Sequence, residues 1–412
     1  MRENFFRTAL ILGLVSAIGP FAVDMYLPAL PSIGGNLGAS LHAVQLSLMS
    51  FILMMSLTQL LYGPLSDIVG RKLPLYIGMS LFGLASIGCA LAPNIAVLVG
   101  LRALQGVGAG AGVVIPRAVV RDLHTGPDAV RLMSLLMLVF SVSPILAPVT
   151  GSLVVLFAGW RGIFWVIAAA AALGLMLAAS QLKETRPASQ RLQSSWSSAF
   201  SAYGRLLRDR NFIGLVLIGA FGMSGFFIYL ANSSFVIINY YGLSPTLYSF
   251  FFASNAAAFI GTAQFNHWLT GRFGLQAVIR VATAGFAATL LSLFAVMLAG
   301  VDRLAVMSIF LFVGYCFLGL IVPNATVLSL ERHGPIAGTA SALLGTLQMT
   351  VATSVMGLAG IFANGTPLPM IGGIAICALT AFGLAKLNLG PPPGRGDNTG
   401  RERESERQRA PP

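Results

Sequence analysis

Residues 63–72 read Gly-Pro-Leu-Ser-Asp-Ile-Val-Gly-Arg-Lys, a short charged stretch between two long apolar runs. Its glycines permit a tight turn, and its acid can stabilise the start of a nearby helix. Its basic pair can bridge to acids elsewhere in the chain, such as Asp122. We therefore expect residues 63–72 to latch the ends of neighbouring helices, although a loop that only carries orienting charge is the simpler alternative.

The composition around this stretch is that of a protein embedded in a bilayer. The 412 residues are 56% hydrophobic and 9% charged, and their mean hydropathy is +0.82. A soluble domain carries about a quarter charged residues, so this chain cannot cover the surface of a water-soluble globule. The 25 basic residues exceed the 13 acidic ones and lie in short gaps between apolar runs. That placement indicates orienting charge and no nucleic-acid partner.

The apolar runs predict an all-α integral membrane protein. A spanning helix needs about 20 apolar residues, and backbone polar groups in lipid must be satisfied within each segment. The expected spans are 7–29, 43–64, 74–93, 95–117, 132–157, 162–182, 212–238, 246–268, 277–300, 303–327, 336–362 and 367–387. The first run begins like a cleavable signal peptide but continues to Pro28, so we expect it to remain as a span. Basic residues gather in alternate loops, which predicts twelve transmembrane helices with both termini in the cytoplasm.

A polar stretch in the middle of the chain divides the expected spans six and six. Residues 114–118 (Val-Ile-Pro-Arg-Ala) are echoed by 321–325 (Ile-Val-Pro-Asn-Ala), which indicates a duplication. The predicted organisation is an N-terminal half (1–182), a cytoplasmic linker (183–211) and a C-terminal half (212–387). Residues 388–412 have too few apolar residues for a core and predict a disordered cytoplasmic tail.

Two charged residues stand well inside expected spans, Asp24 in the first and Arg102 in the fourth. Ionisable groups in a bilayer are costly, so each is a candidate functional residue. Counted along their helices, both lie in the outer half at similar depth, and we expect them to face one another. The functional interpretation is a proton-coupling pair, in which the arginine favours the ionised carboxylate. A structural salt bridge, or an Asp24 that reaches the membrane surface, is the alternative.

No cofactor or metal site is predicted. The three cysteines lie in separate apolar runs, and the four histidines lie in separate loops or helix ends. Glycines at 106, 108, 110 and 112 match a relaxed dinucleotide fingerprint, but they lie inside a span with no strand before them. We expect them to let helices pack closely. The chain has no phosphate-binding loop, so ATP is not expected as a partner.

The expected partners are a small-molecule substrate, protons and the lipid bilayer, and the protein is expected to be a monomer. Sparse charge in the spans argues against a strongly charged substrate. Aromatic, methionine and amide side chains can line a broad apolar cavity, although aromatic residues in spans often face lipid. The cavity candidates are Met25, Tyr26, Met55, Phe226, Tyr229, Asn232, Asn255, Asn324 and Gln348.

Several of these motifs resemble those of a known family. Residues 63–72 resemble the signature loop of the major facilitator superfamily, and residues 101–106 (Leu-Arg-Ala-Leu-Gln-Gly) resemble the fourth-helix motif of its proton-coupled members. Residues 147–152 (Ala-Pro-Val-Thr-Gly-Ser) resemble the antiporter motif, with Ala147 and Ser152 where that pattern has glycine. Residues 24–31, 121–123 and 159–161 narrow the likeness to the Bcr/CflA branch of drug:proton antiporters. The resemblance covers residues 5–387 and weakens in the second half, where Trp268 replaces the acid of the loop.

The resemblance implies a proton-coupled drug exporter that is not an enzyme and works by alternating access. Asp24 would carry the proton and Arg102 would influence its protonation. The implied cytoplasmic gate comprises Gly63, Asp67, Gly70, Arg71, Lys72, Arg121 and Asp122. The antiporter motif contributes Pro144, Pro148 and Gly151, and we expect its prolines to kink the helix. A proton-linked carrier of a metabolite such as an amino acid or short peptide is the alternative, and a channel or a membrane enzyme is a weaker one.

Overall fold

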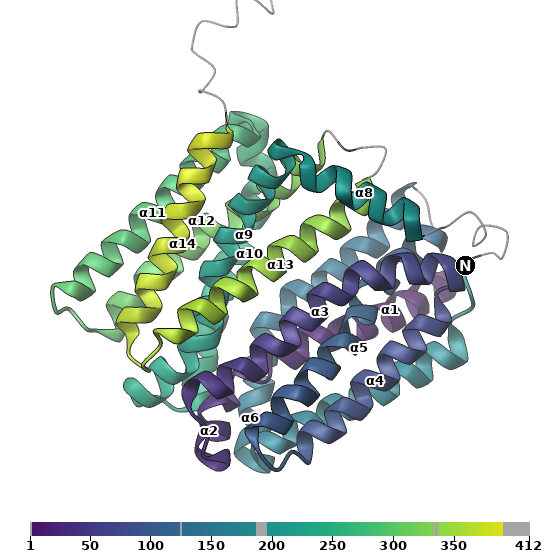
Figure 1. Cartoon of the computed structure of the whole chain (residues 1–412), viewed down its shortest axis with the longest axis horizontal. Helices are drawn as coiled ribbons and strands as arrows, with labels where there is room; N and C mark the ends of the chain where they lie inside the picture. The colour runs from purple at the N-terminus through teal and green to yellow at the C-terminus, as the bar shows by residue number, and fades with distance from the viewer. Residues whose placement is uncertain (1, 124–125, 187–195, 332, 334–336, 390–412) are drawn as a thin grey trace, which may run out of the picture.

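The computed structural model describes residues 2–123, 126–186, 196–331, 333 and 337–389, and every regular element within these ranges is helical (Figure 1). Residues 187–195 of the expected linker and 390–412 of the expected tail lie outside the described residues.

The first group of helices forms one bundle. Its elements are α1 (Arg2–Asp24), the 3-10 turn η1 (Leu27–Ala29), α2 (Leu30–Leu37), α3 (Leu41–Val69), α4 (Lys72–Ala90), α5 (Ile95–Leu123) and α6 (Gly126–Gln181). Helices α1 and α3–α6 pack mainly against one another, and we call them the N-terminal bundle. A Cβ at Gly106 would lie 2.2 Å from the carbonyl oxygen of Phe51, so this glycine lets α5 contact the backbone of α3. The expected role of these glycines in close packing is confirmed.

The second group forms a comparable bundle. Its elements are α9 (Arg210–Ser234), the π-helical turn η2 (Phe235–Tyr240), α10 (Pro245–Phe273), α11 (Leu275–Leu298), α12 (Leu304–Leu330), α13 (Ala337–Ile361) and α14 (Pro367–Asn388). Helices α9–α14 pack among themselves, and we call them the C-terminal bundle. Figure 1 shows it in teal to yellow beside the purple and blue N-terminal bundle.

The bundles meet mainly along two helix pairs, α3 with α13 and α6 with α10, and α3 also contacts α9. One polar contact between them is from Gln45 Nε2 to Asn232 Oδ1 at 2.9 Å, and another is from Ser249 Oγ to the carbonyl oxygen of Pro148 at 2.9 Å. Between the bundles in sequence, α8 (Trp196–Arg208) buries Tyr203 against residues of α9 and α13. Helix α8, the described part of the connection between α6 and α9, therefore packs on the C-terminal bundle.

Ten helical segments in the described part of the chain are long and apolar enough to cross a membrane. Two features separate this number from the twelve expected spans. Helix α6 carries the fifth and sixth expected spans in one element, interrupted at Gly159, where φ is +65°. Helix α10 is 29 residues long but is not among the ten, and its polar residues Asn255, Gln264 and Asn266 lower its hydropathy. The structure keeps α6 helical through Pro144 and Pro148, and its break at Gly159 falls between the expected spans 132–157 and 162–182.

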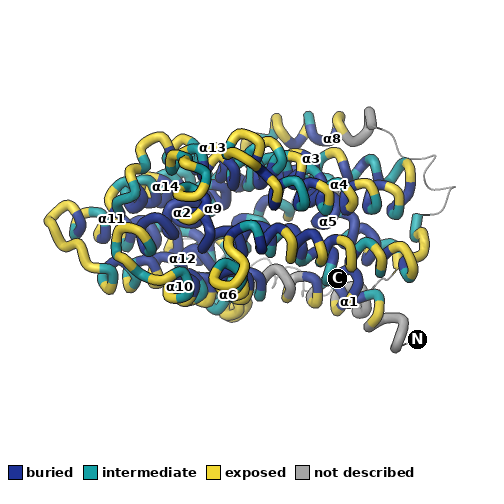
Figure 2. Tube along the Cα trace, turned by 90° about the horizontal axis from the view of Figure 1, so that it is seen from below, coloured by how far each residue is buried: buried dark blue, intermediate teal, exposed yellow. Residues whose placement is uncertain are grey.

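Large apolar side chains cover the outside of the molecule. Exposed residues lie on the outward faces of the helices, and buried residues lie on the faces between them (Figure 2). Phe157 and Leu387 are each 83% exposed, and Leu84 and Ile376 are each 68% exposed. Such surfaces are unfavourable in water and suited to lipid.

Candidate functional site

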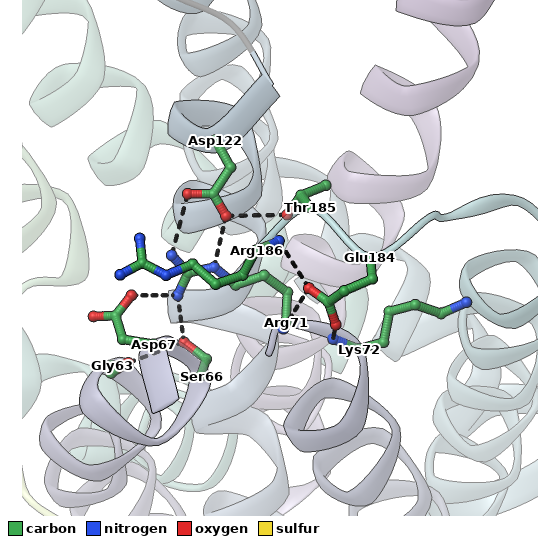
Figure 3. Close-up of polar contacts among 9 residues, drawn as sticks. All are labelled: Gly63, Ser66, Asp67, Arg71, Lys72, Asp122, Glu184, Thr185 and Arg186. Atoms are coloured by element: carbon green, nitrogen blue, oxygen red, sulfur yellow. Dashed lines mark hydrogen bonds and ion pairs between the residues drawn. The ribbon is translucent and has the colours of Figure 1, made fainter. Parts of the chain in front are cut away.

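The charged stretch 63–72 folds into a set of ion pairs around Arg71, shown in Figure 3. The Arg71 side chain is 4% exposed, and its Nη1 lies 2.8 Å from Asp67 Oδ1 and donates to Ser66 Oγ at 2.8 Å. Its Nε and Nη2 donate to the two carboxylate oxygens of Asp122 at 2.7 and 3.2 Å. Burial alone lowers the pKa of Arg71, but the hydrogen bonds and charges of Asp122 and Asp67 outweigh burial and leave that pKa raised. A permanently charged side chain thus joins the α3–α4 turn to the end of α5.

The start of the linker contributes to the same site, which the sequence did not predict. Glu184 accepts hydrogen bonds from the backbone N–H groups of Arg71 at 2.9 Å and Lys72 at 3.2 Å. These groups begin α4, where backbone donors lack partners within the helix and a carboxylate is favourable. Thr185 Oγ1 donates to Asp122 Oδ2 at 3.0 Å. We call these residues the Arg71 cluster: Ser66, Asp67, Arg71, Asp122, Glu184 and Thr185.

The other predicted gate residues lie near the Arg71 cluster, but their side chains form no hydrogen bond or ion pair with Arg71 in the described structure. The Gly63 carbonyl accepts from Ser66 Oγ at 2.9 Å, and Gly70 ends α3 with φ of +102°. The Lys72 ammonium lies 5.5 Å from the centroid of the Tyr76 ring, and Arg121 is exposed. Of the predicted gate residues, the structure therefore brings Asp67, Arg71 and Asp122 together by their side chains.

Replacing Glu184 with Ala is expected to loosen the start of α4, because it removes the carboxylate that accepts from its first two N–H groups. Loss of such a cap costs about 1 kcal/mol, which is roughly a fivefold change in a local opening equilibrium. Hydrogen exchange of the amides in residues 70–75, measured on the purified protein, should speed up by about fivefold. Glu331→Ala, an exposed acid at the end of α12, is the control. Equal exchange in wild type and Glu184→Ala would contradict the capping role.

Asp24 is the last residue of α1 and is 6% exposed, so it does not reach the membrane surface. Its Oδ2 accepts a hydrogen bond from Ser143 Oγ of α6 at 3.0 Å. The antiporter-motif residues of α6 surround the same region. Pro144 follows Ser143, the Pro148 carbonyl accepts the bond from Ser249 of α10, and a Cβ at Gly151 would lie 2.3 Å from the Met25 carbonyl oxygen. The motif thus packs α6 directly against the end of α1 that holds the acid.

Arg102 is fully buried in α5 and is enclosed by rings. Its guanidinium carbon lies 4.2 Å from the centroid of Phe51, 4.5 Å from that of Tyr26 and 5.9 Å from that of Phe164. Arg102 Nη1 donates to Gln105 Oε1 at 2.6 Å, whereas its Nε and Nη2 have no hydrogen-bond partner within the described part of the chain. Cation–π contacts therefore stabilise this charge in place of an acid.

Asp24 and Arg102 do not form the expected pair. Neither a salt bridge nor a hydrogen bond joins them, and the Tyr26 ring, two residues after Asp24, lies against the guanidinium instead. Similar depth along two helices does not fix the direction in which each side chain points around its helix. The expectation that the two residues face one another is therefore wrong for this structure, while their roles in proton coupling stay predictions.

Three of the cavity candidates meet in the C-terminal bundle. Asn255 Nδ2 of α10 donates to the Tyr229 hydroxyl of α9 at 2.9 Å. The Tyr229 ring stacks on Phe252 with a centroid distance of 5.8 Å and contacts Tyr315 of α12 at 5.6 Å. The Phe226 ring contacts both Phe252 and Tyr315. Tyr315 was missed because it stands alone in a very apolar run of α12.

The remaining cavity candidates lie elsewhere. Asn232 pairs with Gln45 across the bundles, and Asn324 pairs with Asn266 within the C-terminal bundle at 2.9 Å. Gln348 lies beside Gly219 and is buried. Met25, Tyr26 and Met55 belong to the N-terminal bundle and are buried in its core. The nine candidates thus fall into separate groups.

Comparison with known proteins identifies the class to which this fold and these motifs belong. The pattern of the Major Facilitator Superfamily matches residues 12–357. The D-xylose-proton symporter has the same fold, with a TM-score of 0.71 over 94% of this chain and 98% of that chain at 17% identity. The chain belongs to the Major Facilitator Superfamily and is a multi-pass transporter of the bacterial inner membrane.

Its relatives narrow the assignment within that family. It is 39% identical to the "Uncharacterized MFS-type transporter YdgK" of Bacillus subtilis (strain 168), over 93% of this chain and 96% of the relative. It is 32% identical to the "Multidrug resistance protein D" of Escherichia coli (strain K12), over 84% and 86%. It is 29% identical to the "Bicyclomycin resistance protein homolog" of Haemophilus influenzae (strain ATCC 51907 / DSM 11121 / KW20 / Rd), over 92% and 95%. These relatives confirm the resemblance to Bcr/CflA-type drug antiporters.

Proposed function

We propose that the protein exports small, largely apolar drugs or toxic compounds across the cytoplasmic membrane in exchange for protons. The observation that carries this proposal is the carboxyl group of Asp24, which is buried at the end of α1 beside the neutral hydroxyl of Ser143. A carboxyl group without a cationic partner in a site of low dielectric can hold or release a proton as its surroundings change. The names of the drug-resistance relatives support the type of cargo.

The proposed architecture has twelve spans, counting two in α6 and one in α10, with both termini in the cytoplasm. Residues 1–182 and 212–387 then form two six-helix halves that rock about their interface. In this orientation the Arg71 cluster lies on the cytoplasmic side and stabilises the N-terminal half there. The contacts of Gln45 with Asn232 and of Ser249 with Pro148 lie toward the outer side.

A pocket of about 420 Å³ at the outer end of this interface supports a release path. Residues on both sides of the interface line it, among them Gly34 of α2, Asn239 of η2 and Asn364 between α13 and α14. Its size suits a drug-sized compound. Breaking the outer contacts would join this pocket to the interior between the bundles.

Everted membrane vesicles test the proposal. A panel of uncharged drugs, cationic dyes, amino acids and short peptides is supplied with and without an imposed pH gradient. Accumulation of drugs that collapses when the gradient is dissipated is the expected result. Gradient-driven transport of amino acids or peptides alone would identify a metabolite carrier. Equal drug transport with and without the pH gradient would contradict the proposed exchange for protons.

A further inference from the structure

Two buried polar atoms beside Tyr229 in the C-terminal bundle have no hydrogen-bond partner among the residues that the structure describes. They are the Oδ1 of Asn255 and the hydroxyl of Tyr315, on side chains that are 4% and 0% exposed. Both residues contact Tyr229, Asn255 through a hydrogen bond and Tyr315 through its ring. Buried polar groups in folded proteins nearly always find a hydrogen-bond partner, so two unsatisfied groups around one side chain indicate a place that another molecule completes. We call Tyr229, Asn255 and Tyr315, with the rings of Phe226 and Phe252, the phenol–amide cluster.

The phenol–amide cluster is connected to the proton site by one face of α10. Tyr248, Phe252 and Asn255 recur at the spacing of helical turns and so lie on the same side of α10. The Tyr248 ring contacts Phe252 with a centroid distance of 6.1 Å, and its hydroxyl lies 3.1 Å from Ser233 Oγ. Helix α10 also packs against η1, the turn that follows Asp24 in the chain.

We infer that the phenol–amide cluster is the recognition site for the transported compound and that it takes an uncharged aromatic compound with both a hydrogen-bond donor and an acceptor. This inference rests on the proposed function. Asn255 Oδ1 would accept from the donor of the compound, and the Tyr315 hydroxyl would donate to its acceptor. The rings of Phe226, Tyr229 and Phe252 would stack on the aromatic group. None of these five residues carries a charge, so an ion placed among them would lose its hydration without compensation.

The test uses Tyr315→Phe, which removes the unpartnered hydroxyl and keeps the ring. The probe is chloramphenicol, an uncharged nitroaromatic amide with two hydroxyl groups, supplied to everted vesicles with an imposed pH gradient. The chloramphenicol concentration that gives half-maximal transport should rise about tenfold in the variant. The maximal rate should stay close to that of wild type. The unfolding temperature of the purified variant should be equal to or higher than that of wild type, because the variant loses an unsatisfied buried group. This combination separates recognition from a structural role.

Asn255→Leu is the second variant and should weaken transport of chloramphenicol by a similar factor. Tyr62→Phe, a buried tyrosine of α3 in the other bundle, is the matched control and should leave transport unchanged. If both variants transport chloramphenicol with the half-maximal concentration of wild type, the inference is wrong. The proposed function would still stand in that case, because it depends on transport by the wild-type protein. Unfolding of both variants would assign the cluster a structural role and also overturn it. If the wild-type protein transports ethidium but not chloramphenicol, the inference that the substrate is uncharged is wrong, while the proposed drug export stands. If the wild-type protein transports no drug at all, the proposed function is wrong as well.

Discussion

Replacing Asp24 with Asn is expected to reduce efflux driven by a pH gradient to the background of vesicles without the protein. The amide has nearly the shape of the carboxylic acid and can still accept the hydrogen bond from Ser143, but it cannot bind or release a proton at physiological pH. The protein should therefore insert and fold while proton movement no longer drives its cycle. Efflux of a transported drug from everted vesicles, with the protein level measured by immunoblot, gives the result directly.

A second measurement isolates the coupling step. Exchange of labelled for unlabelled drug at equal pH on both sides requires binding and movement of the halves but no net proton transfer, so Asp24→Asn should retain it. Asp302→Asn is the matched control, because this acid is exposed in the loop between α11 and α12. Wild-type efflux in Asp24→Asn would remove Asp24 from the mechanism, and loss of exchange together with efflux would indicate a structural role.

The sequence predicts the fold well because the bilayer imposes a simple rule on it. Apolar runs long enough to span lipid must be helical, and the described helices fall within a few residues of most expected spans. The exceptions have physical causes. Helix α6 contains two expected spans, and the positive φ of Gly159 marks the break between them. The amide side chains of α10 lower its hydropathy, so this long helix is not among the ten apolar segments.

The candidate site is predicted less completely, because a site depends on directions and on contacts between distant segments. Asp67, Arg71 and Asp122 could be grouped from charge alone, since opposite charges near adjacent helix ends attract one another. Glu184 could not, because its place at the start of α4 follows from the path of the chain after α6. The direction of Arg102 could not be predicted for a related reason. The rings that enclose its charge come from three separate segments, the turn after α1, helix α3 and helix α6, and nothing in the sequence marks them as neighbours.

Replacing Gly151 with Ala is expected to lower transport at least tenfold, because the added methyl group would clash with the backbone of Met25. Its Cβ would lie 2.3 Å from the carbonyl oxygen and 2.8 Å from the Cα of Met25, and backbone atoms cannot rotate away as a side chain can. Helix α6 must then move away from the end of α1. Ser143, on the same helix, would separate from the Asp24 carboxylate. A 1 Å displacement at a functional centre can cost about a hundredfold in rate, so tenfold is a conservative expectation.

The control for this change is Gly383→Ala in α14, where the added Cβ has no heavy atom within 4 Å. Replacing a helical glycine with alanine in open space stabilises a protein by about 0.5–1 kcal/mol, because alanine loses less backbone entropy on folding. Gly383→Ala should therefore raise the unfolding temperature and leave transport unchanged, whereas Gly151→Ala should lower both. If Gly151→Ala transports normally, the packing of α6 on Met25 does not position the proton site. If Gly151→Ala loses efflux but keeps the unfolding temperature of wild type, the antiporter motif acts on transport without stabilising the N-terminal bundle. The expected loss of transport would then be confirmed, and the expected loss of stability would be wrong.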